Sequence, residues 1–414
     1  MATIGQVQIS VQPSSSRRVM LYASVGPNMA WYDVDEEHTT LIRQGSVTLP
    51  ANVQEAWPHP SRQYLYVAWS NGGPSFNTPS GTGPGLIGSQ HGVSTFRINP
   101  ASGALQPHGQ WISLRSRPIH TTTDIPGAHV LLAYNNPSGV TVHRIQPDGT
   151  FGSEVKPPAM LDAGIYAHQV RVYPSNKSVI LVTRGNGPTG VRPEDPGALK
   201  IFSYEDGLLA NRASIAPGGG FDFQPRHLDF HTSEPWVFVS LERQNKLQVY
   251  KKLTAETLTS EPLFTKDTLT APNRVRPRQA GGTIHMHPTG RFVYVANRCS
   301  GTTDFEGTSV FAGGENSIAV YQINLDTGEP TLIQNIDTRG MHPRTFAVDS
   351  SGHILVAANQ VSLSVRDGNN VRIVPAGLAV FRIRADGTLN FVRKYDVELG
   401  PGRSLFWMGL VSLP

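Results

Sequence analysis

The sequence predicts an all-β fold, and three observations support this. First, no apolar stripe with the i, i+3, i+4, i+7 spacing of an amphipathic helix extends over about 12 residues. Second, 41 glycines and 32 prolines among 414 residues indicate many turns. Third, a unit of about four strands recurs along the chain at intervals of roughly 50 to 65 residues. A repeat of this size and strand content is typical of a β-propeller blade.

Each repeat contains a turn rich in Pro, Ser, Gly or Asp, followed by an apolar run of strand length. The six copies are PHPSRQYLYVAW (58–69), TDIPGAHVLLAYN (123–135), VYPSNKSVILVT (172–183), FHTSEPWVFVSL (230–241), MHPTGRFVYVAN (286–297) and VDSSGHILVAAN (348–359). A further strand follows each copy, as in VSTFRI, VTVHRI, LKIFSY, KLQVYKK, SIAVYQI and LAVFRI. After several of these, a turn such as PDGT, DTGE or ADGT leads to a short fourth strand. Each repeat is therefore expected to form a four-stranded antiparallel blade.

The two ends of the chain are expected to share a seventh blade. The strand SLFWMGLV at the C-terminus has no partner strands after it, whereas VMLYASV and MAWYDV near the N-terminus have no inner strand before them. Joining them closes the ring and removes exposed sheet edges. We therefore predict one seven-bladed β-propeller domain over residues 1–414, with residues 1–17 as an extended N-terminal tail. The alternative is six blades with frayed ends.

Composition limits the classes of function. The net charge is +4, and Lys and Arg are spread along the chain, whereas a nucleic-acid footprint requires a dense basic stripe. A single cysteine, Cys299, excludes an internal disulfide and a cysteine-rich zinc site. No apolar stretch approaches the roughly 18 residues of a membrane span, and the N-terminal residues do not resemble a signal peptide. We expect a cytoplasmic protein without nucleic-acid or membrane partners.

Two polar positions recur at fixed distances from the turns. With His59, Ile125, Tyr173, His231, His287 and Asp349 as references, the residues five positions earlier are Gln54, His120, His168, Arg226, Gly282 and Arg344. The residues eleven positions later are Ser70, Asn136, Arg184, Glu242, Arg298 and Gln360. Because a hairpin folds back on itself, both positions of a blade should meet at its open end. Since the innermost strand of each blade lines the axis, all pairs should lie at one rim.

This expected ring contains more cations than anions. It combines Glu242 and two histidines with four arginines, and Arg403, before the closing strand, is a possible fifth. Guanidinium groups bind carboxylate or phosphate through paired hydrogen bonds, so the ring predicts a small anionic ligand. The structural alternative is a set of ion pairs that tie neighbouring blades together.

Several segments resemble the seven-bladed β-propeller lactonase family, which includes propeller-type 6-phosphogluconolactonases and fungal 3-carboxy-cis,cis-muconate lactonizing enzymes. They are QPRHLDFH, VSLERQNKLQVY, GGTIHMHPTGRFVYVANR, NSIAVYQINLDTGEP and MHPRTFAVDSSGHILVAANQ, and the resemblance is clear over residues 167–383. The proposed active-site set of the muconate-cyclizing branch matches His168, Arg226, Glu242 and Arg298. Insertions at 70–92, 185–198 and 301–315 are longer than expected for the family. Two of them should leave from the rim that carries the ring and are possible lids.

The resemblance implies one of two reactions. In lactone hydrolysis, His168 is the expected general base, and Glu242 either orients it or holds Arg226. Arg226 and Arg298 then bind an anionic group or the developing oxyanion. In muconate cyclization, the arginines hold the substrate's carboxylates and His168 or Glu242 supplies a proton. In both reactions the expected substrate-binding residues are His120, Arg184, Arg344, Gln360 and Arg403.

Two other kinds of function are less well supported. Calcium ligands among Asn135, Asn136, Asn186 and Glu242 lack the accompanying carboxylates that hard cations prefer, so we expect no metal and no cofactor. A non-catalytic scaffold has no reason to gather arginine and histidine at one rim. The favoured interpretation is a metal-independent lactonase acting on an anionic or sugar-derived lactone, with a carboxymuconate cycloisomerase as the alternative.

Overall fold

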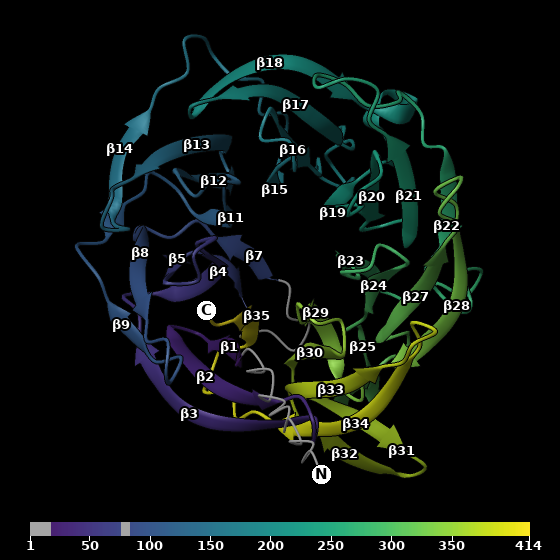
Figure 1. Ribbon diagram of the computed structural model, residues 1–414. Coiled ribbons are helices and arrows are strands. Elements are labelled where there is room, and N and C mark those ends of the chain that lie inside the picture. The colour runs from purple at the N-terminus through teal and green to yellow at the C-terminus, as the bar shows by residue number, and fades with distance from the viewer. Residues whose placement is uncertain (1–17, 76–82) are drawn as a thin grey trace, which may run out of the picture.

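The computed structural model describes residues 18–75 and 83–414, and it confirms the predicted propeller. Seven antiparallel sheets surround a common centre (Figure 1). The predicted tail at 1–17 and part of the insertion at 70–92 lie outside the described residues. Within the described chain the only helical element is a short 3₁₀ turn, Pro217–Gly220.

The blades are numbered along the chain, and their strands are given from the innermost outward. Blade 1 contains β4 (Asn52–Pro58), β5 (Tyr64–Ser70) and β8 (His91–Ile98), with β9 (Leu105–Pro107) and β10 (Ile112–Ser113) at its outer edge. Blade 2 contains β11 (Pro118–Thr123), β12 (His129–Asn135), β13 (Ser138–Ile145) and β14 (Phe151–Val155). Blade 3 contains β15 (Ala167–Val172), β16 (Ser178–Thr183), β17 (Ala198–Glu205) and β18 (Leu208–Ile215). Blade 4 contains β19 (Pro225–Phe230), β20 (Trp236–Leu241), β21 (Lys246–Lys251) and β22 (Phe264–Asp267).

The remaining blades follow the same plan. Blade 5 contains β23 (Ala280–Met286), β24 (Phe292–Arg298), β27 (Ser317–Ile323) and β28 (Pro330–Asp337). Blade 6 contains β29 (Met341–Val348), β30 (Ile354–Val361), β33 (Gly377–Ile383) and β34 (Leu389–Asp396). Blade 7 contains β35 (Leu405–Ser412), β1 (Val19–Val25), β2 (Asn28–Asp35) and β3 (Thr40–Thr48). The C-terminal strand β35 pairs with β1, which confirms the closure predicted from the two ends.

The second strand of each blade is almost wholly buried. Every residue of β12, β16 and β20 is buried, because both faces of these sheets pack against neighbouring blades. Strands covered on both faces show continuous apolar runs in place of strict alternation. This explains the uninterrupted runs, such as WVFVSL, that mark the repeat in the sequence.

A β-bulge interrupts the innermost strand of every blade near its start. The residues left without a partner in the pairing register are Gln54, Ile119, His168, Arg226, Gly282 with Thr283, Arg344 and Phe406. A bulge bends its strand and redirects a side chain, and bulges are common beside active sites. The repeated bulge therefore takes one or two residues of each innermost strand out of the ladder at this rim.

In five of the six compared blades, the residue predicted five positions before the turn reference lies in the bulge of the innermost strand. Blade 2 is the exception. There, Ile119 is the unpaired residue, while His120 pairs with Ala133. The turn reference in blade 2 was placed one residue too late. Asp124, and not Ile125, caps this turn, because its carboxylate accepts hydrogen bonds from the backbone N–H groups of Ala128 and His129. Asp349 caps its own turn in the same way through His353 and Ile354. The matching residue at the end of β12 is Asn135, and Asn136 lies beyond the strand.

Candidate functional site

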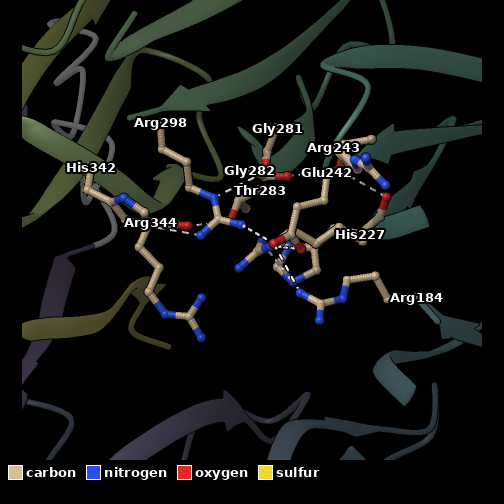
Figure 2. A network of polar contacts seen from close by, with 12 residues as sticks. Arg184, His227, Glu242, Arg243, Gly281, Gly282, Thr283, Arg298, His342 and Arg344 are labelled. Carbon is tan, nitrogen blue, oxygen red and sulfur yellow. Dashed lines mark hydrogen bonds and ion pairs between the residues drawn. The ribbon is translucent and has the colours of Figure 1, made fainter. Parts of the chain in front are cut away.

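The centre of the candidate site is a carboxylate shared by three arginines. Glu242 follows β20, and its Oε1 lies 3.1 Å from Arg184 Nη1 and 3.0 Å from Arg298 Nη2. Its Oε2 lies 3.3 Å from Arg226 Nε. Figure 2 shows Glu242 between Arg184 and Arg298. These residues come from blades 3, 4 and 5, so the ion pairs tie three consecutive blades together at one rim.

The charges in this cluster fix its protonation. Burial alone raises the pKa of Glu242, but the guanidinium groups of Arg184, Arg298 and Arg226 reverse this and hold the pKa well below its usual range. Glu242 is therefore a carboxylate at neutral pH and does not serve as a proton donor. Arg226 is 1% exposed and carries its charge almost wholly out of bulk water. Glu242 was predicted either to orient His168 or to hold Arg226. Within the described chain no hydrogen bond joins Glu242 to His168, whereas the ion pair with Arg226 is present.

Arg298 is held in place by further contacts. Its Nε donates to Gly281 O at 3.1 Å, and its Nη1 donates to His342 Nε2 at 3.0 Å. Because His342 accepts at Nε2, its proton resides on Nδ1, which lies 3.1 Å from Ser300 Oγ. Burial, with the nearby Arg298, lowers the pKa of His342 well below the ordinary value, which agrees with a neutral ring. The guanidinium of Arg298 is thereby fixed before any ligand arrives.

Backbone strain accompanies the site. Three residues adopt left-handed backbone conformations two positions before a bulge: Tyr166 with φ 57°, Gln224 with φ 37° and His342 with φ 57°. Such conformations cost non-glycine residues about 1 to 2 kcal/mol each and concentrate at functional sites. Tyr166 supports Arg184, whose Cζ lies 4.0 Å from the centre of the tyrosine ring. The strained backbone thus positions partners of the arginine cluster.

Three buried histidines lie together beside the arginines. The ring centres of His168 and His227 are 5.0 Å apart, and those of His120 and His227 are 6.2 Å apart. Burial, followed by the charge of Arg226, lowers the pKa of His168 well below 6.5, so the ring is neutral at pH 7. Nδ1 of His168 and of His120 is buried without a hydrogen-bond partner.

On the other side of the axis, two arginines have no carboxylate partner. Arg344 is 9% exposed, its Nε is buried without an acceptor, and its Cζ lies 3.9 Å from the centre of the Phe406 ring. Figure 2 shows its guanidinium pointing away from the Glu242 network. Arg117 donates from Nε to Gln54 Oε1 at 2.6 Å. Within the described residues, neither arginine lies within ion-pair distance of a carboxylate.

A second acidic side chain lies near Arg344. Glu55 is the first paired residue after the bulge of β4, and its Oε1 accepts a hydrogen bond from Trp407 Nε1. Burial raises the pKa of Glu55 to about 8, although the hydrogen bond from Trp407 and the charges of Arg344 and Arg226 oppose the shift. Burial therefore favours the neutral form of Glu55, and in its charged form Glu55 counters the positive charge of Arg344.

The structure brings together most of the predicted site residues. The cluster at the axis contains His168, Arg184, Arg226, Glu242 and Arg298 in mutual proximity, with Arg344 and His120 nearby. Gln360 is buried and donates to Ser404 Oγ at 3.3 Å. Arg403 lies at the same rim but is exposed, and its side chain packs against Gly26 and Gly400. No described contact joins Arg403 to the Glu242 cluster.

Sequence reasoning missed several residues at this centre. They are Glu55, Arg117, His227, His342 and Phe406. Glu55 and His227 each follow a bulge residue directly, so a search one position later in every repeat would have found them. Phe406 occupies the bulge of the closing strand, which had no turn to serve as a reference. Arg117 and His342 lie outside the compared offsets.

The insertions lie at the same rim as the site. The hairpin β6 (Gly73–Ser75) with β7 (Gly83–Leu86), the loop 185–197 and the hairpin β25 (Thr302–Phe305) with β26 (Thr308–Phe311) each follow the second strand of a blade. All three predicted insertions therefore leave from this rim, rather than two. A fourth, not predicted, is the hairpin β31 (Leu363–Asp367) with β32 (Asn370–Val374). It packs against β26, and Arg366 Cζ lies 4.1 Å from the centre of the Phe305 ring.

The arrangement offers no evident cation site. Asn186 is engaged by Asp195 at 2.8 Å, and Glu242 is occupied by arginines. Among the described residues, no group of three or more His, Cys, Asp or Glu side chains is placed to hold a metal ion. The described chain also contains no helix that is long and apolar enough to cross a membrane.

Comparisons with known proteins agree with this architecture. The family model described as "Lactonase, 7-bladed beta-propeller" matches residues 29–367. The 6-phosphogluconolactonase of Bacillus subtilis is 28% identical over 282 residues, which cover 66% of this chain and 71% of that protein. The protein of the same name from Pectobacterium carotovorum is 25% identical over 384 residues, covering 92% and 95%. The structure of a Pseudomonas aeruginosa periplasmic gluconolactonase has a TM-score of 0.69 at 18% identity, covering 96% and 100%, a likeness of fold.

Proposed function

The chain belongs to the seven-bladed β-propeller lactonase family, and we propose that it hydrolyses an anionic, sugar-derived lactone as a 6-phosphogluconolactonase-like enzyme. The observation that carries the proposal is the excess of fixed arginines over carboxylates at the axis. Relatives that are 28% and 25% identical to this chain are named 6-phosphogluconolactonase. The reaction adds water to the lactone carbonyl and breaks the ring C–O bond, which yields a hydroxy acid.

In this proposal Glu242 is a positioning residue, and Arg226 and Arg298 contact the reacting group. Glu242 fixes both guanidinium groups, which still have N–H groups free of the carboxylate, since each guanidinium carries five N–H donors. Those donors stabilise the oxyanion that forms when water attacks the carbonyl carbon. A preorganised donor of this kind contributes about 3 kcal/mol to transition-state stabilisation.

His168 is the proposed general base. Its lowered pKa keeps the ring neutral at pH 7, so it is ready to accept a proton from water. The same depressed pKa makes the protonated ring a strong acid, which favours rapid transfer of that proton to the leaving ring oxygen. The neighbouring Arg226 disfavours any lasting positive charge on His168.

The same excess of cations also supports the cyclization alternative. Among the described residues, Arg117, Arg184, Arg226, Arg298 and Arg344 gather at this rim with the carboxyl groups of Glu55 and Glu242. A carboxymuconate carries several carboxylates that such a set would hold. In that reaction one substrate carboxylate attacks the double bond and a proton is delivered to carbon.

One assay series separates these functions. The protein, treated with EDTA, is mixed with 6-phosphoglucono-δ-lactone or glucono-δ-lactone, and proton release is followed above the spontaneous rate; ultraviolet absorbance is followed with 3-carboxy-cis,cis-muconate. His168→Ala and Arg226→Ala should abolish the enzymatic rate, whereas His38→Ala, at an exposed turn, should not. Absorbance loss with the muconate and no lactone hydrolysis would make the protein a cyclizing enzyme. Inactivity on all three substrates would refute the proposed hydrolysis of these lactones.

A further inference from the structure

The charges around the axis are divided between two sectors. Blades 3, 4 and 5 supply Arg184, Arg226 and Arg298, which share Glu242. Arg344 from blade 6 and Phe406 from blade 7 form the other sector, together with Gln54 from blade 1 and the Arg117 that it binds. Gln54, Arg344 and Phe406 are all bulge residues of their strands. The same backbone device therefore builds a compensated sector and an uncompensated one.

The uncompensated sector is costly for the empty protein. A buried charge without a partner is destabilising, and a neutral side chain of similar size is usually tolerated better. Burial and the charges of Arg298 and Arg117 lower the pKa of Arg344 to about 9, and the charges of Glu55 and Glu242 only partly oppose this shift; arginine remains charged at neutral pH. Burial likewise lowers the pKa of Arg117 to about 10. The contacts with Phe406 and Gln54 offset part of this cost, and an anion bound between the two guanidinium groups would supply the missing counter-charge.

In the second sector, neighbouring side chains contact and orient both guanidinium groups. Phe406 provides a ring face for Arg344 at 3.9 Å, and the Arg117 Cζ lies 6.0 Å from the same ring centre. Gln54 orients Arg117 from one side. The backbone of Gly73, with φ 133°, lies so close that a Cβ there would be 3.3 Å from Arg117 Nε. The positive φ disfavours any side chain at position 73, and a Cβ there would be in tight contact with the guanidinium.

The charge and hydrogen-bonding capacity of this sector fit a phosphate monoester better than a carboxylate. Phosphate presents three acceptor oxygens and close to two negative charges, and guanidinium groups bind it through paired hydrogen bonds. Burial favours the neutral form of Glu55, which does not repel such a ligand. Two arginines with paired donors thus match a dianion with three oxygens.

We propose that Arg117 and Arg344, on the platform of Phe406, form a subsite that binds the phosphate of a phosphorylated sugar lactone. This inference rests on the proposed function and divides the site by task. The subsite holds the remote anionic group, and the Glu242-bound arginines contact the lactone carbonyl. Remote binding energy of this kind orients the substrate at the reacting centre.

The first test is direct binding, which does not require turnover. Isothermal titration of the full chain with 6-phosphogluconate and with inorganic phosphate should show binding that weakens at least tenfold in Arg344→Met and in Arg117→Gln. The matched controls Arg393→Met and Arg115→Gln remove exposed arginines that also lie over tyrosine rings, and should bind within twofold of the unaltered protein. Equal binding in all variants would overturn the subsite. Gluconate that competes as well as 6-phosphogluconate would overturn the assignment to phosphate.

The second test uses kinetics and stability. Arg344→Met should raise KM for 6-phosphoglucono-δ-lactone at least tenfold, and change kcat/KM for glucono-δ-lactone less than threefold. Its unfolding temperature should equal or exceed that of the unaltered protein, because an uncompensated charge has been removed; a large decrease would show that Arg344 is structural and would overturn the proposal. Arg344→Lys retains the charge without the paired donors, so its KM for 6-phosphoglucono-δ-lactone should lie between those of the unaltered protein and Arg344→Met.

Failure of the subsite and failure of the proposed function give different results. Arginine-dependent binding of 6-phosphogluconate without lactone turnover would uphold the subsite and refute hydrolysis. Turnover of both lactones with equal loss in Arg344→Met would uphold hydrolysis and refute the subsite.

Discussion

Replacing Glu242 with glutamine removes one negative charge and changes the size of the side chain very little. In the unaltered protein this carboxylate lies 3.0 to 3.3 Å from nitrogen atoms of three guanidinium groups. The amide leaves all three cations near the axis without a counter-charge. It also places an NH₂ donor where one of the guanidinium groups requires an acceptor.

The expected cost follows from this geometry. Breaking one buried ion pair by removing a partner typically costs about 3 to 5 kcal/mol. The Glu242 side chain is 17% exposed, which reduces the cost of one pair, but the substitution breaks three pairs and leaves mutual repulsion among the arginines. We therefore expect a loss of about 3 kcal/mol or more. With an unfolding entropy of ~2.1 cal/mol/K per residue over 414 residues, this corresponds to a decrease in Tm of roughly 3 to 4 °C.

The pH dependence provides an independent check. Because the arginines hold the pKa of Glu242 below its usual range in the folded state, its contribution is fully present above about pH 4.5 and is lost as pH falls through the folded-state pKa. The difference in stability between the two proteins should therefore be constant from pH 5 to pH 8. It should shrink only in more acidic solution. Thermal unfolding followed by circular dichroism at several pH values measures it.

Glu329→Gln is the matched control. Glu329 Oε1 lies 2.6 Å from Lys266 Nζ, but the two side chains are 44% and 32% exposed, and such surface pairs contribute at most about 1 kcal/mol. High salt should reduce the effect of the control substitution and leave that of Glu242→Gln largely unchanged. A loss for Glu242→Gln no larger than for the control would refute the view that Glu242 holds the arginine cluster together.

Further predictions concern protonation, geometry and cofactors. Burial raises the folded-state pKa of Glu55 to about 8, so the unaltered protein loses stability as pH rises from about 4.5 to 8. Glu55→Gln lacks this loss, so its stability relative to the unaltered protein should increase over that range. Thermal unfolding at pH 5, 7 and 8.5 measures the difference. If His168 is the general base, its lowered pKa predicts a kcat/KM profile without an inflection near pH 6.5, and a fall in rate only at lower pH; an inflection at 6.5 would argue against that role. Arg226→Lys retains the charge but loses the paired donors, and should reduce kcat/KM by at least tenfold in the lactone assay. Dialysis against EDTA should leave the lactonase rate unchanged, and a loss restored by a divalent cation would refute metal independence. Cell fractionation tests the cytoplasmic localisation that the sequence favours.

The fold was predictable because its signals are local and repeated. Each blade carries a turn, an apolar run and a following strand at similar spacing, so errors in one copy are corrected by the others. The closure of the ring followed from unpaired edges at both ends, and the pairing of β35 with β1 confirms it. The position of the arginine cluster was predictable for the same reason, since the repeated register carries Arg226 and Glu242 to one rim.

The details of the site were less predictable because they depend on single residues and on contacts between blades. In blade 2 the turn was aligned on Ile125, one residue after Asp124, which forms the turn. As a result His120 was predicted at the bulge, whereas it occupies the paired position that follows the bulge. Arg117 reaches the axis from the segment that precedes β11 and has no counterpart at the compared offsets. The neutral state of His168 arises from burial and from Arg226, which belongs to the next blade. No feature of the local sequence around His168 indicates either effect.

The bulge in each innermost strand separates the stability of the fold from the composition of the site. Because the bulge residue is unpaired in the ladder, its side chain is free to change without disturbing the hydrogen bonds of the blade. Arg226 and Arg344 occupy this position in blades 4 and 6, yet only Arg226 has a carboxylate partner. If the bulge residues served only to tie blades together, Arg344 would be expected to have a partner as well. The absence of an ion pair at Arg344 in the described chain therefore supports the proposed subsite.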